Sequence, residues 1–107
     1  MKAVVVWMIK IKIQRQKNKI IYFEIKGHAN FSEYGEDVIC AAVSSVGQMT
    51  VNGLIETLKL KKKLKFTEED GYISCDLKNS GLTDDELENA DILVESMYSY
   101  LKDVAKS

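Results

Sequence analysis

The sequence predicts an α+β domain with the element order β-β-α-β-β-α, in which two helices pack on an antiparallel four-stranded sheet. Three observations predict this class. Apolar and polar residues alternate along the first part of the chain, and a long, mostly apolar segment follows. Two short alternating segments then precede a segment whose apolar residues recur at helical spacing. The length of 107 residues predicts a single domain over residues 1–107.

Two strands are expected before the first helix. Residues 3–13 alternate as one half-buried strand. Polar residues 14–18 predict a turn, and the alternation returns in residues 19–27 as a second strand that leads into His28. The apolar residues of the first strand are expected to share one face: Val5, Trp7, Ile9, Ile11 and Ile13.

The first helix is predicted over residues 37–60, after a loop over residues 28–36. Its residues are apolar around most of the circumference, so more than one side of the helix must be covered. The sheet would cover one side, and a second helix or a second subunit would cover another.

A hairpin is predicted after this helix. The dipeptide Asp70-Gly71 separates the alternating segments 64–69 and 72–77, and it is typical of a two-residue hairpin turn. Cys75 shares a strand face with Ile73 and Leu77, so it is interpreted as a small core residue.

The last helix is predicted to begin at a capping box. Thr83 and Glu86 have the spacing of that motif, in which each side chain accepts a hydrogen bond from the other residue's backbone N–H. Apolar residues then recur at helical spacing as far as Val104.

Composition argues against several classes of function. A net charge of −1 gives no global basis for binding nucleic acid, and no segment is long enough to cross a bilayer. Residues 3–9 are interpreted as part of a strand, not a signal peptide, because no small-residue cleavage site follows them. Cys40 and Cys75 form no disulfide framework, and with His28 they lack the spacing of a metal site. We therefore expect reduced thiols, no metal, no cofactor and a cytoplasmic protein.

Five lysines follow the first helix between Lys59 and Lys65. The simpler interpretation is a solvated helix end followed by edge-strand lysines. The alternative is an electrostatic contact with RNA or an acidic partner. No aromatic residue lies between these lysines, so direct binding to nucleic acid is not expected.

His28 and Cys40 have the chemistry of a general base and a thiol nucleophile. If Asp37 is the N-cap, Cys40 lies in the first helical turn, where the helix dipole favours the thiolate. His28 stands at a strand end, so its imidazole could reach the thiol, take its proton and later protonate a leaving amine. Ser44 lies one turn after Cys40 on the same helix face.

Other interpretations of these residues stay open. Asp37 either orients His28 or only caps the helix. A lone cysteine in an apolar helix is commonly a core residue. Thiol-transfer or redox sensing is less favoured, because no second cysteine stands at Cys-x-x-Cys spacing. A binding module without catalysis would use the Lys59 to Lys65 segment as its contact surface.

The segment from residue 27 to residue 44 resembles the ribosomal-processing cysteine protease (Prp) family. The resemblance extends over nearly the whole chain in element order, and the spacing between the histidine and the cysteine agrees with the catalytic pair of that family. The matching residues are Gly27-His28-Ala29, Tyr34-Gly35, Asp37, Cys40-Ala41 and Ser44.

The resemblance implies a bacterial homodimer that removes a short N-terminal extension from a large-subunit ribosomal protein, cleaving after an aromatic residue. By this analogy Cys40 is the nucleophile of a Cys/His dyad and His28 is the general base. Gly27, Asp37 and Ser44 match supporting positions near the site. The loop over residues 29–36 would cover the substrate and contribute Phe31, Tyr34 and Gly35.

Overall fold

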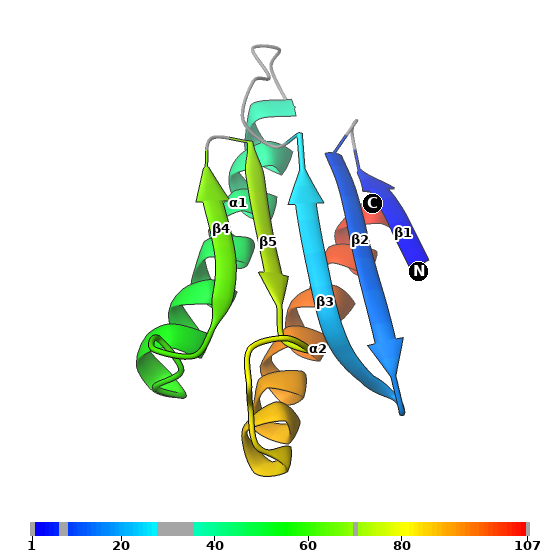
Figure 1. The fold of residues 1–107 in the computed structure, drawn as a ribbon. Helices are drawn as coiled ribbons and strands as arrows, with labels where there is room; N and C mark the ends of the chain where they lie inside the picture. The colour runs from blue at the N-terminus through cyan, green and yellow to red at the C-terminus, as the bar shows by residue number, and fades with distance from the viewer. Residues whose placement is uncertain (1, 7–8, 28–35, 70, 107) are drawn as a thin grey trace.

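The computed structural model describes residues 2–6, 9–27, 36–69 and 71–106. These form a sheet of five antiparallel strands in the order β1-β2-β3-β5-β4, with two helices behind one face (Figure 1). The elements along the chain are β1 (Lys2–Val6), β2 (Ile9–Gln16), β3 (Lys19–Lys26), α1 (Glu36–Asn52), the π-helix η1 (Gly53–Thr57), β4 (Lys65–Glu69), β5 (Tyr72–Asp76) and α2 (Asp84–Lys106). The predicted α+β class is confirmed.

The predicted number of strands was wrong, because the segment predicted as one strand forms two. β1 and β2 pair antiparallel, with Val6 opposite Ile9 and Val5 opposite Lys10. Val5 and Ile9 are therefore not successive residues of one strand, as the alternation suggested. No glycine, proline, asparagine or aspartate stands between Val6 and Ile9, so the sequence carries no turn signal there.

The β2–β3 hairpin turns at Lys17 and Asn18, which have positive φ angles of 53° and 66°. Two consecutive positive φ values are typical of the tight turns that join twisted strands. A register shift between Gln14 and Arg15 locally disturbs the alternation, and the adjacent Ile20 and Ile21 are both buried.

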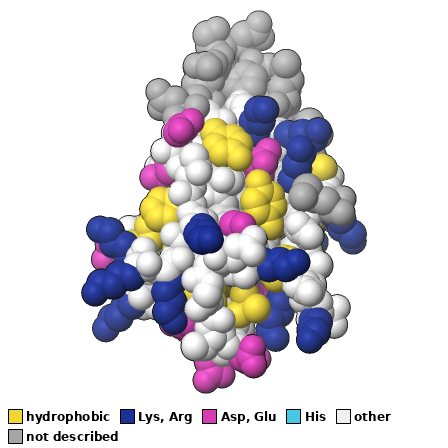
Figure 2. All heavy atoms as spheres, in the orientation of Figure 1, with side chains coloured by type: hydrophobic (Ala, Val, Ile, Leu, Met, Phe, Trp, Pro, Cys, Tyr) yellow, Lys and Arg dark blue, Asp and Glu magenta, His cyan; other side chains and the backbone are white. Residues whose placement is uncertain are grey.

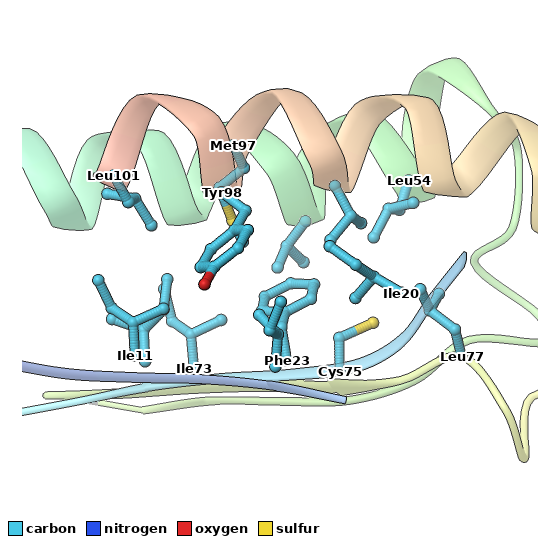
Figure 3. Packing of buried hydrophobic residues seen from close by; sticks show 14 of the residues in the cluster. Ile11, Ile20, Phe23, Leu54, Ile73, Cys75, Leu77, Met97, Tyr98 and Leu101 are labelled. Carbon is cyan, nitrogen blue, oxygen red and sulfur yellow. The ribbon is translucent and has the colours of Figure 1, made fainter. Parts of the chain in front are cut away.

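The core lies between the sheet and the helices (Figure 3). Cys75 and Phe23 pair across β3 and β5, and both are 0% exposed. Met97 and Leu101 of α2 and Leu54 of η1 face the sheet from the helix side of this core (Figure 3). The predicted burial of Ile73, Cys75 and Leu77 is confirmed.

The first helix is less regular than predicted, because it ends at Asn52 and continues as η1. The helical segment closes where Lys59 adopts a φ of 57° and the Leu60 N–H donates to the Leu54 carbonyl at 3.0 Å. A Cβ at Gly53 would lie 2.7 Å from Cδ2 of Leu93, so the glycine permits the close approach of η1 to α2.

The predicted capping box of the last helix is present. The Glu86 N–H donates to Oγ1 of Thr83 at 3.1 Å, and the Thr83 N–H donates to Oε1 of Glu86 at 2.9 Å. Among the described residues, neither helix is long and apolar enough to cross a membrane.

Candidate active site

Gly27 ends β3 in a conformation that requires glycine. Its φ is 94°, and its N–H donates to the Gly71 carbonyl at 2.7 Å, which ties the end of β3 to the β4–β5 turn. A residue with a Cβ is strained at this φ. The backbone that precedes His28 is therefore held in one direction.

α1 begins at the same end of the sheet (Figure 1). The helix crosses β3 and β5 closely enough that a Cβ at Gly47 would lie 3.0 Å from Ile73 and 3.1 Å from Ile25. Cys40 lies about two turns before Gly47, towards the end where β3 reaches Gly27. The cysteine and the residue that precedes His28 are thus brought to one end of the domain.

Cys40 lies deeper in α1 than predicted. The helix begins at Glu36, so Asp37 is already inside the first turn and is not the residue that precedes the helix. Cys40 then stands where the first turn passes into the second, and the influence of the helix dipole falls off over that distance. Its side chain is 9% exposed, at the edge of the core, and Ser44 one turn later is half-buried.

Cys75, the other thiol of the chain, is more deeply buried than Cys40. It is 0% exposed on β5, and burial, followed by the charge of Asp76, raises the pKa of the thiol to about 12. Cys40 and Cys75 are not joined by a disulfide. A thiol with so high a pKa is a poor nucleophile, so Cys75 is a structural residue, as predicted.

Four of the predicted site residues lie outside the described part of the chain: His28, Phe31, Tyr34 and Gly35. The backbone of Asp37 is described, but its side chain is not. Gly27, Cys40 and Ser44 are the predicted site residues that the structure places. Within the described ranges, no three His, Cys, Asp or Glu side chains come together as a metal site.

A hydrogen-bonded cluster that the sequence did not predict lies on the side of the sheet away from the helices. The Tyr22 hydroxyl donates to Glu24 at 2.8 Å, and the Tyr72 hydroxyl donates to the same carboxylate oxygen at 3.4 Å. Partial burial and the bond to Glu24 raise the pKa of Tyr22. The only sequence signal was the strand alternation, which places Tyr22 and Glu24 on one face. Figure 2 shows that hydrophobic side chains are scattered among charged ones on this side.

The chain was compared with known proteins. Residues 8–107 match the family described as Cysteine protease Prp. The ribosomal processing cysteine protease Prp of Bacillus subtilis is 34% identical over 100 residues, which are 92% of this chain and 88% of that protein.

Solved structures share the fold. The crystal structure of SMU.848 from Streptococcus mutans is 33% identical, with a TM-score of 0.66 over 86% of this chain and 78% of that one. The S. aureus ribosomal processing protease Prp, crystallised with a substrate peptide, is 21% identical, with a TM-score of 0.68 over 91% of this chain and 86% of that one. With the family match over residues 8–107 and the 34% identical relative, the chain belongs to the Prp family of cysteine proteases.

Proposed function

We propose that this protein removes an N-terminal extension from a large-subunit ribosomal protein, with Cys40 as the nucleophile and His28 as the general base. The observation that carries the proposal is the convergence of two elements at one end of the sheet. α1 brings Cys40 there, and Gly27, at a φ of 94° that glycine adopts without strain, follows β3 and precedes His28 at the same end (Figure 1). The name of the Bacillus subtilis relative, a ribosomal processing protease, supports the choice of substrate.

The chemistry requires four proton transfers, two in the acylation half and two in the deacylation half. His28 takes the thiol proton of Cys40, and the sulfur attacks the carbonyl carbon of the scissile peptide bond. The tetrahedral intermediate collapses when the histidine gives its proton to the leaving amine, which leaves an acyl group on the sulfur. A water molecule, deprotonated by His28, then attacks this thioester and releases the carboxylate and the thiol.

The remaining predicted residues have positioning roles in this proposal. Ser44 follows Cys40 by one helical turn and lies on the same face, from which its hydroxyl can support the nucleophile or the substrate. Asp37 stands within the first turn of α1, and its carboxylate would orient the imidazole of His28. Phe31 and Tyr34 would contact the aromatic residue of the extension from the loop that contains them.

We also propose that the protein acts as a homodimer through the outer surface of its helices. Met49 of α1 is 60% exposed, and Ile92 of α2 is 65% exposed. Beside Ile92, an open groove of about 340 Å³ runs between η1 and α2 over Gly53, Leu58 and Leu93. An exposed apolar side chain beside an open, mainly apolar groove forms a continuous apolar surface of the kind that marks a protein–protein interface. Sedimentation equilibrium on the wild-type protein and on Ile92→Glu tests this, since the glutamate should shift a dimer to a monomer.

The proteolytic proposal is tested on the host's own large-subunit ribosomal protein with its extension intact. Wild-type protein, Cys40→Ala, His28→Ala and the matched control Cys75→Ala are each incubated with this substrate, and the products are weighed by intact mass spectrometry. A single cut near the substrate N-terminus is expected from the wild type and from Cys75→Ala alone. Cleavage by Cys40→Ala would refute the assignment of the nucleophile.

A further inference from the structure

The segment between η1 and β4 is strongly basic. We define the lysine loop as the segment that presents Lys59, Lys61, Lys62, Lys63 and Lys65, all of which are exposed. Figure 2 shows Lys and Arg side chains gathered at the lower left, where Figure 1 places the connection between α1 and β4. This is the opposite end of the sheet from Gly27 and the start of α1, so the candidate active site does not account for the loop.

The lysine loop is held to the domain by its leucines. Leu60 is 1% exposed and Leu64 is 7% exposed, so both side chains are in the core. The Leu64 N–H donates to the Leu60 carbonyl at 2.8 Å, and the Lys65 N–H donates to Oγ of Ser80 at 2.9 Å. Because the apolar residues point inward and the backbone is hydrogen-bonded, the loop presents lysine side chains to solvent from a fixed base.

Little of this charge is neutralised within the domain. Among the described residues, Lys63 is the one member of the loop in an ion pair, with Glu86 at 2.6 Å. The other four lysines of the loop have no ion pair among the described residues. Because the whole chain has a net charge of −1, this positive charge is concentrated at the loop. A local excess of this kind attracts a polyanion even though the whole protein is nearly neutral.

The composition of the loop favours phosphate groups over an acidic protein surface. Protein interfaces are depleted in lysine and depend on apolar or aromatic anchors, and the loop's own apolar residues, Leu60 and Leu64, are buried. Phosphate backbones need only positioned positive charge.

We propose that the lysine loop binds the phosphate backbone of RNA, at a surface separate from the proteolytic site. This departs from the expectation drawn from the sequence, because the sequence alone did not show that Leu60 and Leu64 are buried and that the lysines extend from a fixed base. The choice of RNA over another polyanion rests on the proposed function, because a ribosomal protein, the proposed substrate, binds ribosomal RNA. Binding at this surface would hold the protease near a substrate that is already on RNA.

The test compares two triple variants with equal loss of charge. Lys59→Gln/Lys61→Gln/Lys62→Gln removes the unpaired charges at the tip of the loop. The matched control, Lys10→Gln/Lys12→Gln/Lys26→Gln, removes three lysines that the register of β2 and β3 places together away from the loop. Thermal melts followed by circular dichroism verify that both variants are folded.

Binding to a fluorescein-labelled 12-nucleotide single-stranded RNA is measured by anisotropy across a range of salt concentrations. For the loop variant we expect the slope of log affinity against log salt to fall by about 2, at ~0.7 per lost phosphate contact. Between about 50 and about 200 mM salt, the wild type should thus lose roughly 20-fold more affinity than the loop variant does. The control variant should keep most of the wild-type slope.

Three results would overturn the proposal: no RNA binding by the wild type at low salt, equal loss in both triple variants, or preference of the wild type for a poly-glutamate peptide over RNA. The last result would assign the loop to an acidic protein. The assay involves no cleavage, so Cys40→Ala should bind RNA like the wild type. The loop variant should cleave a short extension peptide normally, which keeps failure of this proposal distinct from failure of the proteolytic one.

Discussion

Replacing Cys75 by alanine should change how the stability of the domain depends on pH. Burial raises the pKa of the folded-state thiol to about 12, whereas a cysteine in an unfolded chain titrates near ~8.5 to 9. Between those two values the unfolded chain has released the proton and the folded chain has not, so rising pH favours unfolding. The contribution of this thiol to stability is therefore complete below pH ~8.5 and is lost progressively up to pH ~12.

The size of the effect follows from the width of that window. With an unfolded pKa of about 9, three pKa units correspond to at most about 4 kcal/mol, at ~1.4 kcal/mol per unit. At pH ~10.5, halfway through the window, the wild type should have lost about 2 kcal/mol of its free energy of unfolding through Cys75, against ~0.1 kcal/mol at pH ~8. Cys75→Ala lacks this loss, and its cavity cost does not depend on pH.

The assay is urea unfolding followed by circular dichroism in a phosphine reductant, for both proteins at both pH values. The stability difference between wild type and Cys75→Ala should shrink by about 2 kcal/mol from pH ~8 to pH ~10.5. Every other titrating group is present in both proteins, so its contribution cancels in the difference. A difference that is the same at both pH values would refute the reasoning that burial holds this thiol protonated.

Three further results are expected. Iodoacetamide at pH ~8 should label Cys40 before Cys75 in a time course followed by peptide mass mapping. A pKa near 12 leaves only about one Cys75 thiol in ten thousand ionised, and the thiolate is the form that reacts. Equal labelling rates for the two cysteines would contradict this. Thr83→Ala should lower the free energy of unfolding by about 1 kcal/mol in urea titrations, because an N-cap hydrogen bond to α2 is lost; Thr67→Ala on the exposed strand β4 is the control. Gly27→Ala should lower the free energy of unfolding by about 1–3 kcal/mol, because the φ of Gly27 is 94°. It should also lower the cleavage rate more than Gly81→Ala does, because Gly81, with a φ of 69°, is remote from the proposed site. Unchanged cleavage in Gly27→Ala would count against the role given to that turn.

The sequence predicted most elements because their signals are local. The capping box at Thr83, the hairpin of β4 with β5 and the inward face of β5 each depend on a few adjacent residues, and each prediction agrees with the described structure. The error at β1 and β2 has the opposite cause. Two short strands in one apolar segment have the sequence pattern of a single strand when no turn residue lies between them. Only the pairing of Val6 with Ile9 in the structure distinguishes two strands from one.

Residues near the proposed site show the same distinction. The burial of Cys75 follows from the alternation of its strand, whereas the positive φ of Gly27 has no signal in the sequence beyond the glycine itself. The depth of Cys40 in α1 depends on the residue at which the helix begins, and helix starts vary by a residue or two without a change in sequence pattern. The Tyr22–Glu24–Tyr72 cluster depends on β3 lying beside β5, a long-range pairing that no local signal reports.

The same pairing of β3 with β5 has a consequence for the order of folding. The pairs β1·β2, β2·β3 and β4·β5 join neighbours along the chain and close short loops, whereas β3·β5 encloses all of α1 and η1. Closing that long loop costs more chain entropy than forming any of the hairpins, so we expect it to be the slow step. Gly27 bonds to Gly71 only after this step. A newly synthesised chain would therefore complete the end of the sheet that holds Gly27 after its hairpins have formed, so cleavage at the proposed site would have to wait for this long-range pairing.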